Sequence, residues 1–481
     1  MRTYIRNIRE SEFACSALIL PIPEGKGAGC YKDIDKALNG LMRKVMASEE
    51  FSGKHNEVCL IHAEGKIKPD RILLIGLGNK KDITPEKLRQ TGGKTASYLK
   101  TLNIRDAALS AESIRSLGLS YVDFIEGVML ANYDFTKYKK ENTGKGISKI
   151  TVLSDKVLNK EVRWVDKTTA AVHFARDLVN TPSNDMTPSA LVRAARSLKN
   201  VRIKVIDRAR AAELGMGAYL SVARGSVEPL KFIEIIYKGK KNIPPVALIG
   251  KSITFDSGGI SLKPGQGMEK MKYDMAGGAA VLGAIKAASE INLPVHIVGI
   301  LPAAENLPGG SASKPGDVVR TIGGKTIEII STDAEGRLAL ADAIEYAKRF
   351  KPSAIIDIAT LTGACAITFG SEVIAMMGNN QPIMEKLKKA SAETAEKVWQ
   401  MPLFDEYKDY IKSDIADLKN SGGRSGSLSS SGYFLKEFAG ETPWVHLDIA
   451  GTAWIDKGRP YIPKGATGIG VRLLLSFLRL L

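Results

Sequence analysis

Short apolar runs that alternate with helical patterns constrain the fold of this chain more than any other feature. Residues 71–78 (RILLIGLG) form a continuous apolar run ending in glycine, which is typical of a strand buried in a parallel sheet. The next segment, 84–102, predicts a helix with Thr84 as N-cap and Pro85 at the first helical position. Residues 148–154 predict another strand. This alternation favours the α/β class, with a mostly parallel or mixed sheet flanked by helices.

The same alternation continues through the second part of the chain. A predicted helix over 168–180 ends at Asn180, before Pro182. Further strands are predicted over 244–251, 295–301, 326–331 and 354–361, and further helices over 276–291 and 336–350. Because 481 residues exceed what one core usually holds, we expect two α/β domains, 1–165 and 166–481.

Three further segments carry structural expectations. The run from Phe13 to Ile22 predicts a buried first strand that ends at Pro21 and Pro23. The polar stretch 136–149 predicts a surface excursion. The apolar tail, 471–481, is much shorter than the ~20 residues that a membrane span needs. We therefore expect the tail to be a packing helix and expect no membrane association.

Cysteine and histidine usage limits the kinds of metal site and compartment. The four cysteines form no C-x-x-C pair, which argues against a zinc knot or a disulfide framework and predicts a reducing, cytoplasmic location. The five histidines are scattered and form no H-E-x-x-H motif. Any metal must therefore be held mostly by carboxylates.

The net charge of +16 has two interpretations. The tightest lysine clusters, at 137–140 and 238–241, are modest, and a solvated surface explains them. An additional nucleic-acid-binding role is the alternative, and it stays open here.

Three segments place ionisable side chains just after predicted strands or at the start of a predicted helix. They are 250–264 (GKSITFDSGGISLKP), 271–280 (MKYDMAGGAA) and 331–340 (STDAEGRLAL), and they supply Lys251, Asp256, Lys263, Asp274, Asp333, Glu335 and Arg337. Asp333 and Glu335 would share one face if the chain stayed extended, and Gly336 would let it turn into the helix. Arg337 falls in the first helical turn, where free amides and a guanidinium favour a small anion.

Gathered in one pocket, the four carboxylates would repel one another strongly. Two divalent cations would neutralise them, as in two-metal hydrolytic sites. Lys251 could add a nitrogen ligand only if it were deprotonated, which metal proximity and burial favour. Lys263 would stay protonated and stabilise an oxyanion.

Each of these residues also has a purely structural interpretation. Asp256 could cap a turn, Asp274 could be a helix N-cap, and Asp333 and Glu335 could interact with the dipole of the next helix. The two lysines and the arginine could be ordinary surface charges. A phosphate-binding loop at DSGG is disfavoured because neither glycine-loop spacing is present.

At these segments the chain resembles the leucyl aminopeptidase (cytosol aminopeptidase) family. STDAEGRL is similar to the family's signature octapeptide, and the other two segments resemble its remaining metal-site segments. Further matches are ENLPGGSASKPGDVV (305–319), ADLKN (416–420) and HLDIAGTAW (446–454). The matches span roughly 170–470 in the family's order, whereas the N-terminal part matches only loosely, through RILLIGLG.

The resemblance implies a C-terminal catalytic domain and a homohexamer whose active sites face an interior cavity. By matching positions it implies five metal ligands: Lys251, Asp256, Asp274, Asp333 and Glu335. The first metal would take all of these except Asp333. The second would take Asp256, Glu335 and Asp333, the last through its side chain and its backbone carbonyl.

The remaining site residues also follow from the resemblance. Lys263 and Arg337 match the two catalytic positions. The apolar specificity pocket should involve Met271, Thr360, Gly363, Ala450 and Ala453. The family usually has Asn where this chain has Ser331. We expect this shorter side chain to loosen the turn that presents Asp333, which would change metal affinity or rate without removing activity.

The implied reaction is metal-dependent hydrolysis of the N-terminal residue, preferably leucine or another apolar residue, from peptides. A metal-bridging water would attack, Lys263 would stabilise the oxyanion, and Arg337 would hold a bicarbonate that shuttles the proton. Manganese or zinc is favoured by a lysine nitrogen among oxygen ligands, and magnesium or cobalt are the other family metals. An inactive relative that only assembles is a further alternative.

Overall fold

In the computed structural model the chain divides into two compact units. The first comprises Met1–Thr169 and Lys457–Lys464, and the second comprises Ala170–Asp456 and Gly465–Leu481. Helix α6 (Asn159–Asn180) runs across residue 165, where the sequence pattern placed the domain boundary.

The structure describes residues 1–25, 27–140, 146–239 and 243–481. Two of the expectations fall partly outside these residues. The predicted surface excursion includes 141–145, and the second lysine cluster includes 240 and 241, none of which the structure describes.

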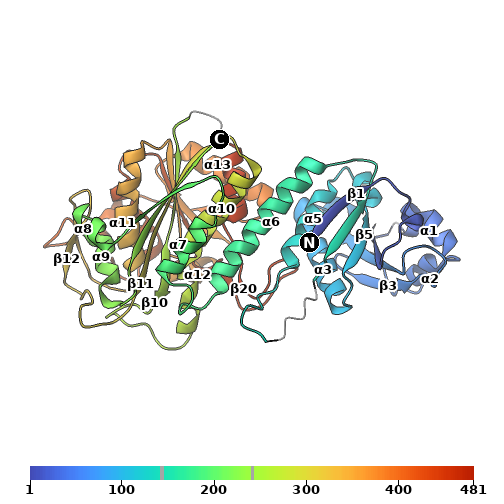
Figure 1. The fold of residues 1–481 in the computed structure, drawn as a ribbon, viewed down its shortest axis with the longest axis horizontal. Coiled ribbons are helices and arrows are strands. Elements are labelled where there is room, and N and C mark those ends of the chain that lie inside the picture. The colour runs from blue at the N-terminus through green and yellow to red at the C-terminus, as the bar shows by residue number, and fades with distance from the viewer. Residues whose placement is uncertain (26, 141–145, 240–242) are drawn as a thin grey trace. The chain divides into compact units, whose positions relative to one another are not determined.

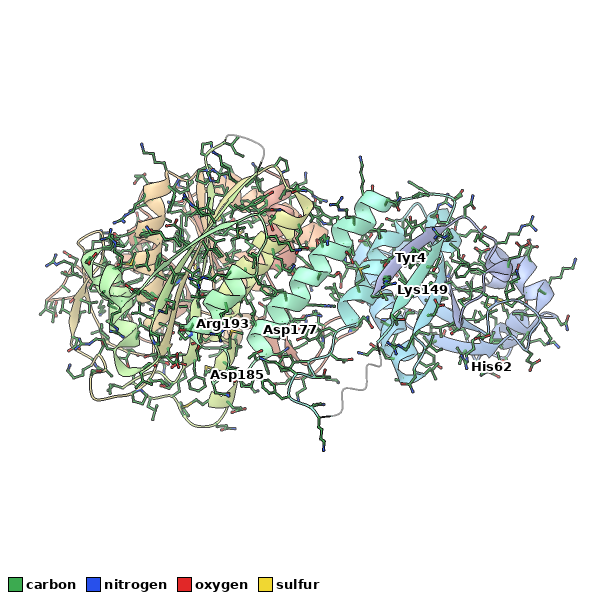
Figure 2. The ribbon with its side chains drawn as sticks, in the orientation of Figure 1. Tyr4, His62, Lys149, Asp177, Asp185 and Arg193 are labelled. Atoms are coloured by element: carbon green, nitrogen blue, oxygen red, sulfur yellow. The ribbon has the colours of Figure 1, made fainter. Side chains whose placement is uncertain are left out.

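Six strands form the sheet of the first unit, in the order β1-β6-β5-β2-β4-β3 (Figure 1). They are β1 (Arg2–Arg6), β2 (Ala17–Pro23), β3 (Val58–His62), β4 (Arg71–Gly78), β5 (Asp106–Ser110) and β6 (Lys149–Leu153). All neighbours are parallel except β3 and β4. Figure 2 labels Tyr4 and Lys149 on the adjacent strands β1 and β6. The predicted strands over 71–78 and 148–154 are confirmed.

The buried run that ends at Pro23 is the second strand of the chain and not the first. Residues Arg2–Arg6 form β1 at the edge of the sheet. Among the described strands, β1 pairs with β6 alone. Their side chains are partly or fully exposed. An edge strand with charged ends lacks the apolar run that marks a buried strand, so the pattern did not reveal it.

Helices cover both faces of this sheet. One face carries α3 (Pro85–Thr101) and α5 (Tyr121–Ala131), and the other carries α1 (Lys32–Ala37) and α2 (Leu41–Ala47). Shorter helices are η1 (Glu10–Glu12), η2 (Gly27–Tyr31), η3 (Lys80–Asp82) and α4 (Glu112–Ser116). The predicted N-cap is confirmed, since the hydroxyl of Thr84 accepts a hydrogen bond from the amide of Lys87 at 3.2 Å.

The second unit is built on a nine-stranded mixed sheet, ordered β16-β15-β18-β14-β9-β11-β8-β7, with β10 also paired to β11. Its strands are β7 (Arg202–Ile206), β8 (Lys231–Lys238), β9 (Val246–Gly250), β10 (Ser252–Asp256), β11 (His296–Asn306), β14 (Ala354–Ala359), β15 (Ile374–Gly378), β16 (Val398–Gln400) and β18 (Trp444–Asp448). Its central strands β18, β14, β9 and β11 are parallel. Two small sheets contain β12 (Val318–Arg320), β13 (Thr326–Glu328) and β17 (Leu418–Lys419), and β19 (Trp454–Ile455) and β20 (Gly465–Ala466).

Helices α10 (Ala276–Ile291) and α11 (Glu335–Ala347) pack on this sheet (Figure 1). The other helices are α7 (Pro188–Arg196), α8 (Arg208–Glu213), α9 (Gly217–Val222), η4 (Ala223–Gly225), η5 (Met268–Met275), η6 (Lys348–Phe350), α12 (Gly363–Phe369), α13 (Gln381–Thr394), η7 (Asp405–Ile411), α14 (Ser427–Ala439) and α15 (Val471–Arg479). The small residues of α10 permit the expected close packing, because a Cβ at Gly277 would lie 2.1 Å from the carbonyl oxygen of Ile358.

The two-domain α/β fold class is therefore confirmed, and so is the packing helix at the C-terminal end, where Val471–Leu478 are buried. Across the described part of the chain, no helix is long and apolar enough to cross a membrane. One predicted strand is shorter than expected: β13 ends at Glu328, and the chain then forms an irregular loop before α11.

Candidate active site

The site is organised by an interruption in one long strand. β9 and β10 run one after the other along β11, and Lys251 is the single residue between them. β9 also pairs with β14 as far as Gly250, and the amide of Lys251 still donates to the carbonyl of Ile358 at 3.1 Å. Lys251 thus stands at the carboxyl end of central parallel strands, where ligands gather in open α/β sheets.

The Lys251 ammonium lies between two buried carboxylates. Its Nζ is 2.7 Å from Asp274 Oδ2 and 2.8 Å from Glu335 Oε1, and it donates to the carbonyl of Thr360 at 2.9 Å. Burial lowers the pKa of Lys251, but the charges of Asp274, Glu335 and Asp256 outweigh burial and raise it above its ordinary value. Without a metal, this lysine is a charged counter-ion for the carboxylates.

A glycine is required at position 336 because the Lys251 side chain packs against it, and not because the chain turns there. The residue lies inside α11, so the expected role of letting the chain turn is wrong. A Cβ at this position would lie 2.4 Å from Lys251 Cε and 2.7 Å from Nζ. Any side chain at 336 would displace the lysine from its carboxylates.

A second lysine bridges the other two carboxylates. Lys263 Nζ is 2.9 Å from Asp256 Oδ2 and also contacts Asp333 Oδ1. Burial lowers the pKa of Lys263, whereas Asp256, Glu335 and Asp333 raise it, and the net shift is upward. The lysine side chain is 23% exposed, so its charged end can meet a bound substrate.

Asp256 both caps a turn, as its structural interpretation predicted, and faces the site, as its functional interpretation predicted. Its Oδ1 accepts hydrogen bonds from the amide of Gly258 at 2.9 Å and from Asn306 Nδ2 at 2.8 Å. Gly258 has φ +88°, which a side chain would strain. The turn cap therefore uses one oxygen, and the other oxygen faces Lys263.

The chain from Ser331 to Glu335 is not extended. We expected Asp333 and Glu335 to share one face only if this segment stayed extended. It forms a turn in which the amide of Ala334 donates to the carbonyl of Ser331 at 3.2 Å, and Glu335 is the first residue of α11. The turn nevertheless achieves the expected convergence. Carboxylate oxygens of Asp256, Asp333 and Glu335 all lie within 4.8 Å of one another.

Asp274 is not an N-cap. Helix α10 begins after Met275, whose side chain makes no cap bond. The Oδ1 of Asp274 instead accepts hydrogen bonds from Lys251 at 2.9 Å and from the Thr360 hydroxyl at 2.7 Å. The site therefore joins four carboxylates to two lysines.

The pKa shifts of Asp274, Glu335 and Asp333 indicate that the two lysines do not supply enough positive charge for the carboxylates. Burial first, and then neighbouring carboxylates, raise the pKa of Asp274 and of Glu335. The Oε2 of Glu335 is buried and has no hydrogen-bond partner among the described residues. Asp333 is also shifted, because burial raises its pKa against the opposing effect of Lys263. Buried carboxylates with an unsatisfied oxygen fit the oxygen-rich donor set of a divalent metal site.

Arg337 lies in the first turn of α11 and is 7% exposed. Its Nη1 donates to the carbonyl of Asn420 at 2.6 Å, and its Nε has no hydrogen-bond partner among the described residues. Burial lowers its pKa to about 10, although Glu335 and Asp448 act to raise it. The guanidinium is therefore charged at neutral pH and retains a free donor.

The five residues expected to form the specificity pocket have different environments. The hydroxyl of Thr360 is engaged by Asp274, and Met271 precedes Asp274 in η5. Gly363 begins α12 and is exposed. Ala450 is partly buried against a small apolar cluster, and Ala453 is buried. Their role in binding substrate stays a prediction.

Several residues that support the site were not assigned a role from the sequence. Asn306 donates to Asp256 and to the carbonyl of Thr332 at 3.0 Å, and the Thr332 hydroxyl donates to the carbonyl of Gly258 at 2.6 Å. Asn420 holds Arg337. Both asparagines lie in segments that resemble the family, ENLPGG and ADLKN, and that resemblance was the only signal for them.

Comparisons with known proteins agree along nearly the whole chain. The catalytic-domain model of the cytosol aminopeptidase family matches residues 173–475, and the N-terminal-domain model of the same family matches residues 23–142. A probable cytosol aminopeptidase of Geobacter sp. is 44% identical over 100% of both chains. The cytosol aminopeptidase of Pseudomonas aeruginosa is 40% identical over 99% of both.

Solved structures give the same result. A mutant of tomato leucine aminopeptidase is 30% identical with a TM-score of 0.89, covering 100% of this chain and 96% of the other. The bottromycin maturation enzyme BotP in complex with Mn is 30% identical with a TM-score of 0.87, covering 97% and 99%. The resemblance seen in the sequence is confirmed, and the chain belongs to the cytosol aminopeptidase family of metal-dependent peptidases.

Proposed function

We propose that this aminopeptidase removes leucine and other apolar N-terminal residues from peptides at a site for two divalent metal ions. The observation that carries the proposal is the convergence of four carboxylates, three of them buried, on only two lysine ammonium groups. Two dications would balance this charge, whereas the lysines alone leave a buried excess of negative charge.

The residues that would hold the metals are Lys251, Asp256, Asp274, Asp333 and Glu335. When bound, the ions would supply a water of lowered pKa and a Lewis acid for the scissile carbonyl. Lys251 would have to release its proton to become a nitrogen ligand, so metal binding should be coupled to proton release. A nitrogen among oxygen donors favours manganese or zinc, with magnesium or cobalt as alternatives.

Lys263 would stabilise the oxyanion. Its raised pKa keeps it protonated at neutral pH, and its Nζ already faces the carboxylates beside which the substrate carbonyl would lie. A charged donor aimed at developing negative charge is worth most where water is excluded. The partial exposure of this lysine supports contact with substrate.

Arg337 would hold a bicarbonate through the guanidinium donors that the protein leaves free. Its buried Nε without a partner supports this assignment, and the N-terminal turn of α11 favours an anion. The bicarbonate would carry a proton from the attacking water to the leaving amine. This role follows the family resemblance.

Substrate selection is assigned to Met271, Thr360, Gly363, Ala450 and Ala453. Four of the five have small or apolar side chains, which suits an apolar first residue. The Thr360 hydroxyl would contribute by orienting Asp274, to which it is bonded.

We also propose a homohexamer in the cytoplasm. The four cysteines are free, which supports a reducing compartment. Light scattering should give six times the chain mass. The additional nucleic-acid role stays a prediction, which a mobility-shift assay at low salt would test.

The decisive experiment combines metal analysis with turnover. The purified protein should contain two divalent ions per chain, lose activity on chelation, and recover with Mn²⁺ or Zn²⁺. It should cleave leucine p-nitroanilide faster than the lysine or glutamate analogues. No turnover with any divalent metal would contradict the proposal, and the absence of two bound ions would favour the inactive relative.

A further inference from the structure

Asn420 holds the loop that carries Asp333. The residue follows β17 and is completely buried. Its Oδ1 accepts hydrogen bonds from the amides of Ile330 at 2.8 Å and Ser331 at 3.3 Å. Its Nδ2 donates to the carbonyls of Ser331 at 2.7 Å and Ala334 at 3.4 Å. One side chain thus binds backbone on both sides of Asp333.

The backbone of the same residue holds the arginine. The Asn420 amide donates to the carbonyl of Glu328 at 2.9 Å, and its carbonyl accepts from Arg337 Nη1 at 2.6 Å. Asn420 is therefore bonded to the end of β13, to the Asp333 loop and to the candidate anion site. Hydrogen bonds from Ser261 and Asn306 also hold the adjacent Thr332, and the Asp333 side chain is 40% exposed.

Only a side-chain amide can make this set of bonds. The loop presents two amide donors and two carbonyl acceptors, and asparagine offers an acceptor oxygen and a two-proton donor on one short planar group. An aspartate would set a carboxylate against two carbonyl oxygens. A serine or alanine would leave buried backbone groups unsatisfied, which is costly.

We propose that Asn420 is a positioning residue that holds the Asp333 loop in its metal-binding conformation and aligns Arg337 with it. This inference rests on the proposed two-metal function. Among the described residues, Asn420 makes no hydrogen bond to a metal-ligand side chain, unlike Asn306, which donates directly to Asp256. Any effect of Asn420 on metal binding must therefore pass through the loop.

Asn379 provides a control with similar hydrogen bonds in the same unit, although Asn379 is exposed and Asn420 is buried. Its Nδ2 donates to the carbonyls of Gly440 at 2.9 Å and Thr442 at 3.0 Å, and its Oδ1 accepts from the amide of Trp444 at 2.7 Å. It therefore makes the same kind of clasp, in which one side-chain amide both donates to and accepts from the backbone of a loop. That loop carries no candidate site residue. Asn379→Ala reports the cost of losing such bonds at an exposed position, and the unfolding temperature of Asn420→Ala reports the cost at the buried one.

The test is calorimetric titration of metal-free Asn420→Ala, Asn379→Ala and the parent protein with Mn²⁺, together with thermal unfolding and steady-state kinetics. Loss of a partner that orients a metal ligand typically weakens metal affinity or activity by about 10- to 100-fold. We expect Asn420→Ala to bind at least one Mn²⁺ about 10- to 100-fold more weakly and to lose kcat more than it raises KM. Asn379→Ala should unfold at a lower temperature and bind both ions like the parent.

Parental Mn²⁺ affinity in Asn420→Ala would overturn the inference, even if its unfolding temperature fell. A parent protein that binds no Mn²⁺ would instead contradict the proposed function. If Asn420→Ala does not fold, Asn420→Asp keeps its volume and Ser331→Ala removes the hydroxyl that accepts from the Asp333 amide at 3.3 Å. Both should weaken Mn²⁺ binding, and parental affinity in both would overturn the inference.

Discussion

Both units bring charged loops to the carboxyl ends of parallel strands, but only the second unit buries an unbalanced charge there. In the first unit, loops after β1, β5 and β6 line a hollow of about 780 Å³. Three cations and three anions line it, and four of these six residues are exposed. Arg115 pairs with Asp155, which is 62% exposed, and the Ser110 hydroxyl donates to Glu10 at 2.8 Å.

In the second unit the equivalent end of the sheet carries an excess of buried negative charge. The side chains of Asp256 and Glu335 are only 3% and 2% exposed, and four carboxylates share two lysines. Burial penalises each charge unless it is paired. The comparison teaches that strand topology alone does not identify a site, whereas burial combined with unequal charge does.

The largest expected difference between the units is in catalysis. Lys263→Ala removes the cation assigned to the oxyanion, and kcat/KM should fall by about 100- to 1000-fold. Arg115→Ala removes the half-buried cation that pairs with Asp155 in the first unit, and kcat/KM should change by less than about twofold, because an ion pair with an exposed partner contributes little. Steady-state hydrolysis of leucine p-nitroanilide measures both. A comparable fall of kcat/KM in the two variants would contradict the difference between the units.

One isosteric change made in both units should separate them in metal binding. Glu335→Gln removes a candidate ligand, and Mn²⁺ affinity should fall by at least the roughly 10- to 100-fold expected for an outer partner. The metal-free variant should unfold at the parental temperature or above, because burial and Asp256 raise the pKa of Glu335 and thus disfavour its charge. Titration calorimetry and thermal unfolding provide the two readings.

Glu112→Gln is the control for that change, since Glu112 is exposed and lines the hollow of the first unit. Its Mn²⁺ affinity should match the parent, and its free energy of unfolding should stay within about 0.5 kcal/mol. Equal effects of the two substitutions on Mn²⁺ binding would remove the distinction between the units.

A further difference should be a pH dependence confined to the second unit. The pKa values of Asp274 and Glu335 are raised, so the metal-free fold loses stability as pH rises from their ordinary values near 4 through the folded values. Mn²⁺ binds the ionised carboxylates, and Lys251, whose pKa is also raised, must release a proton. Stabilisation by Mn²⁺ should therefore increase with pH, by about 1.4 kcal/mol per pH unit for each proton released.

Thermal unfolding with and without Mn²⁺ at pH 6 and pH 8 checks this dependence. Hydrogen exchange should locate it, with Mn²⁺ slowing exchange in α11 and leaving α5 unchanged. The same Mn²⁺-induced shift at both pH values would argue against proton-coupled binding. Equal protection of the two helices would argue against a site confined to the second unit.

Much of the fold was predictable because its signals are local. The apolar run 71–78 became β4, and the small-residue segment 276–291 became α10 with the predicted bounds. Hydrophobic periodicity and caps act within a few residues, so they can be read along the chain. Strand β1 was missed because a partly exposed edge strand carries little of this signal.

The sequence by itself determined which residues could form the site: the carboxylates, two lysines and an arginine in three recognisable segments. Only the tertiary structure decided how they meet. The break at Lys251, the turn at Ser331–Ala334, the space left by Gly336 and the clasp by Asn420 depend on contacts between distant segments. Such contacts follow from strand register and helix packing, which bring residues 80 or more positions apart within hydrogen-bond distance. Local sequence patterns do not specify that register.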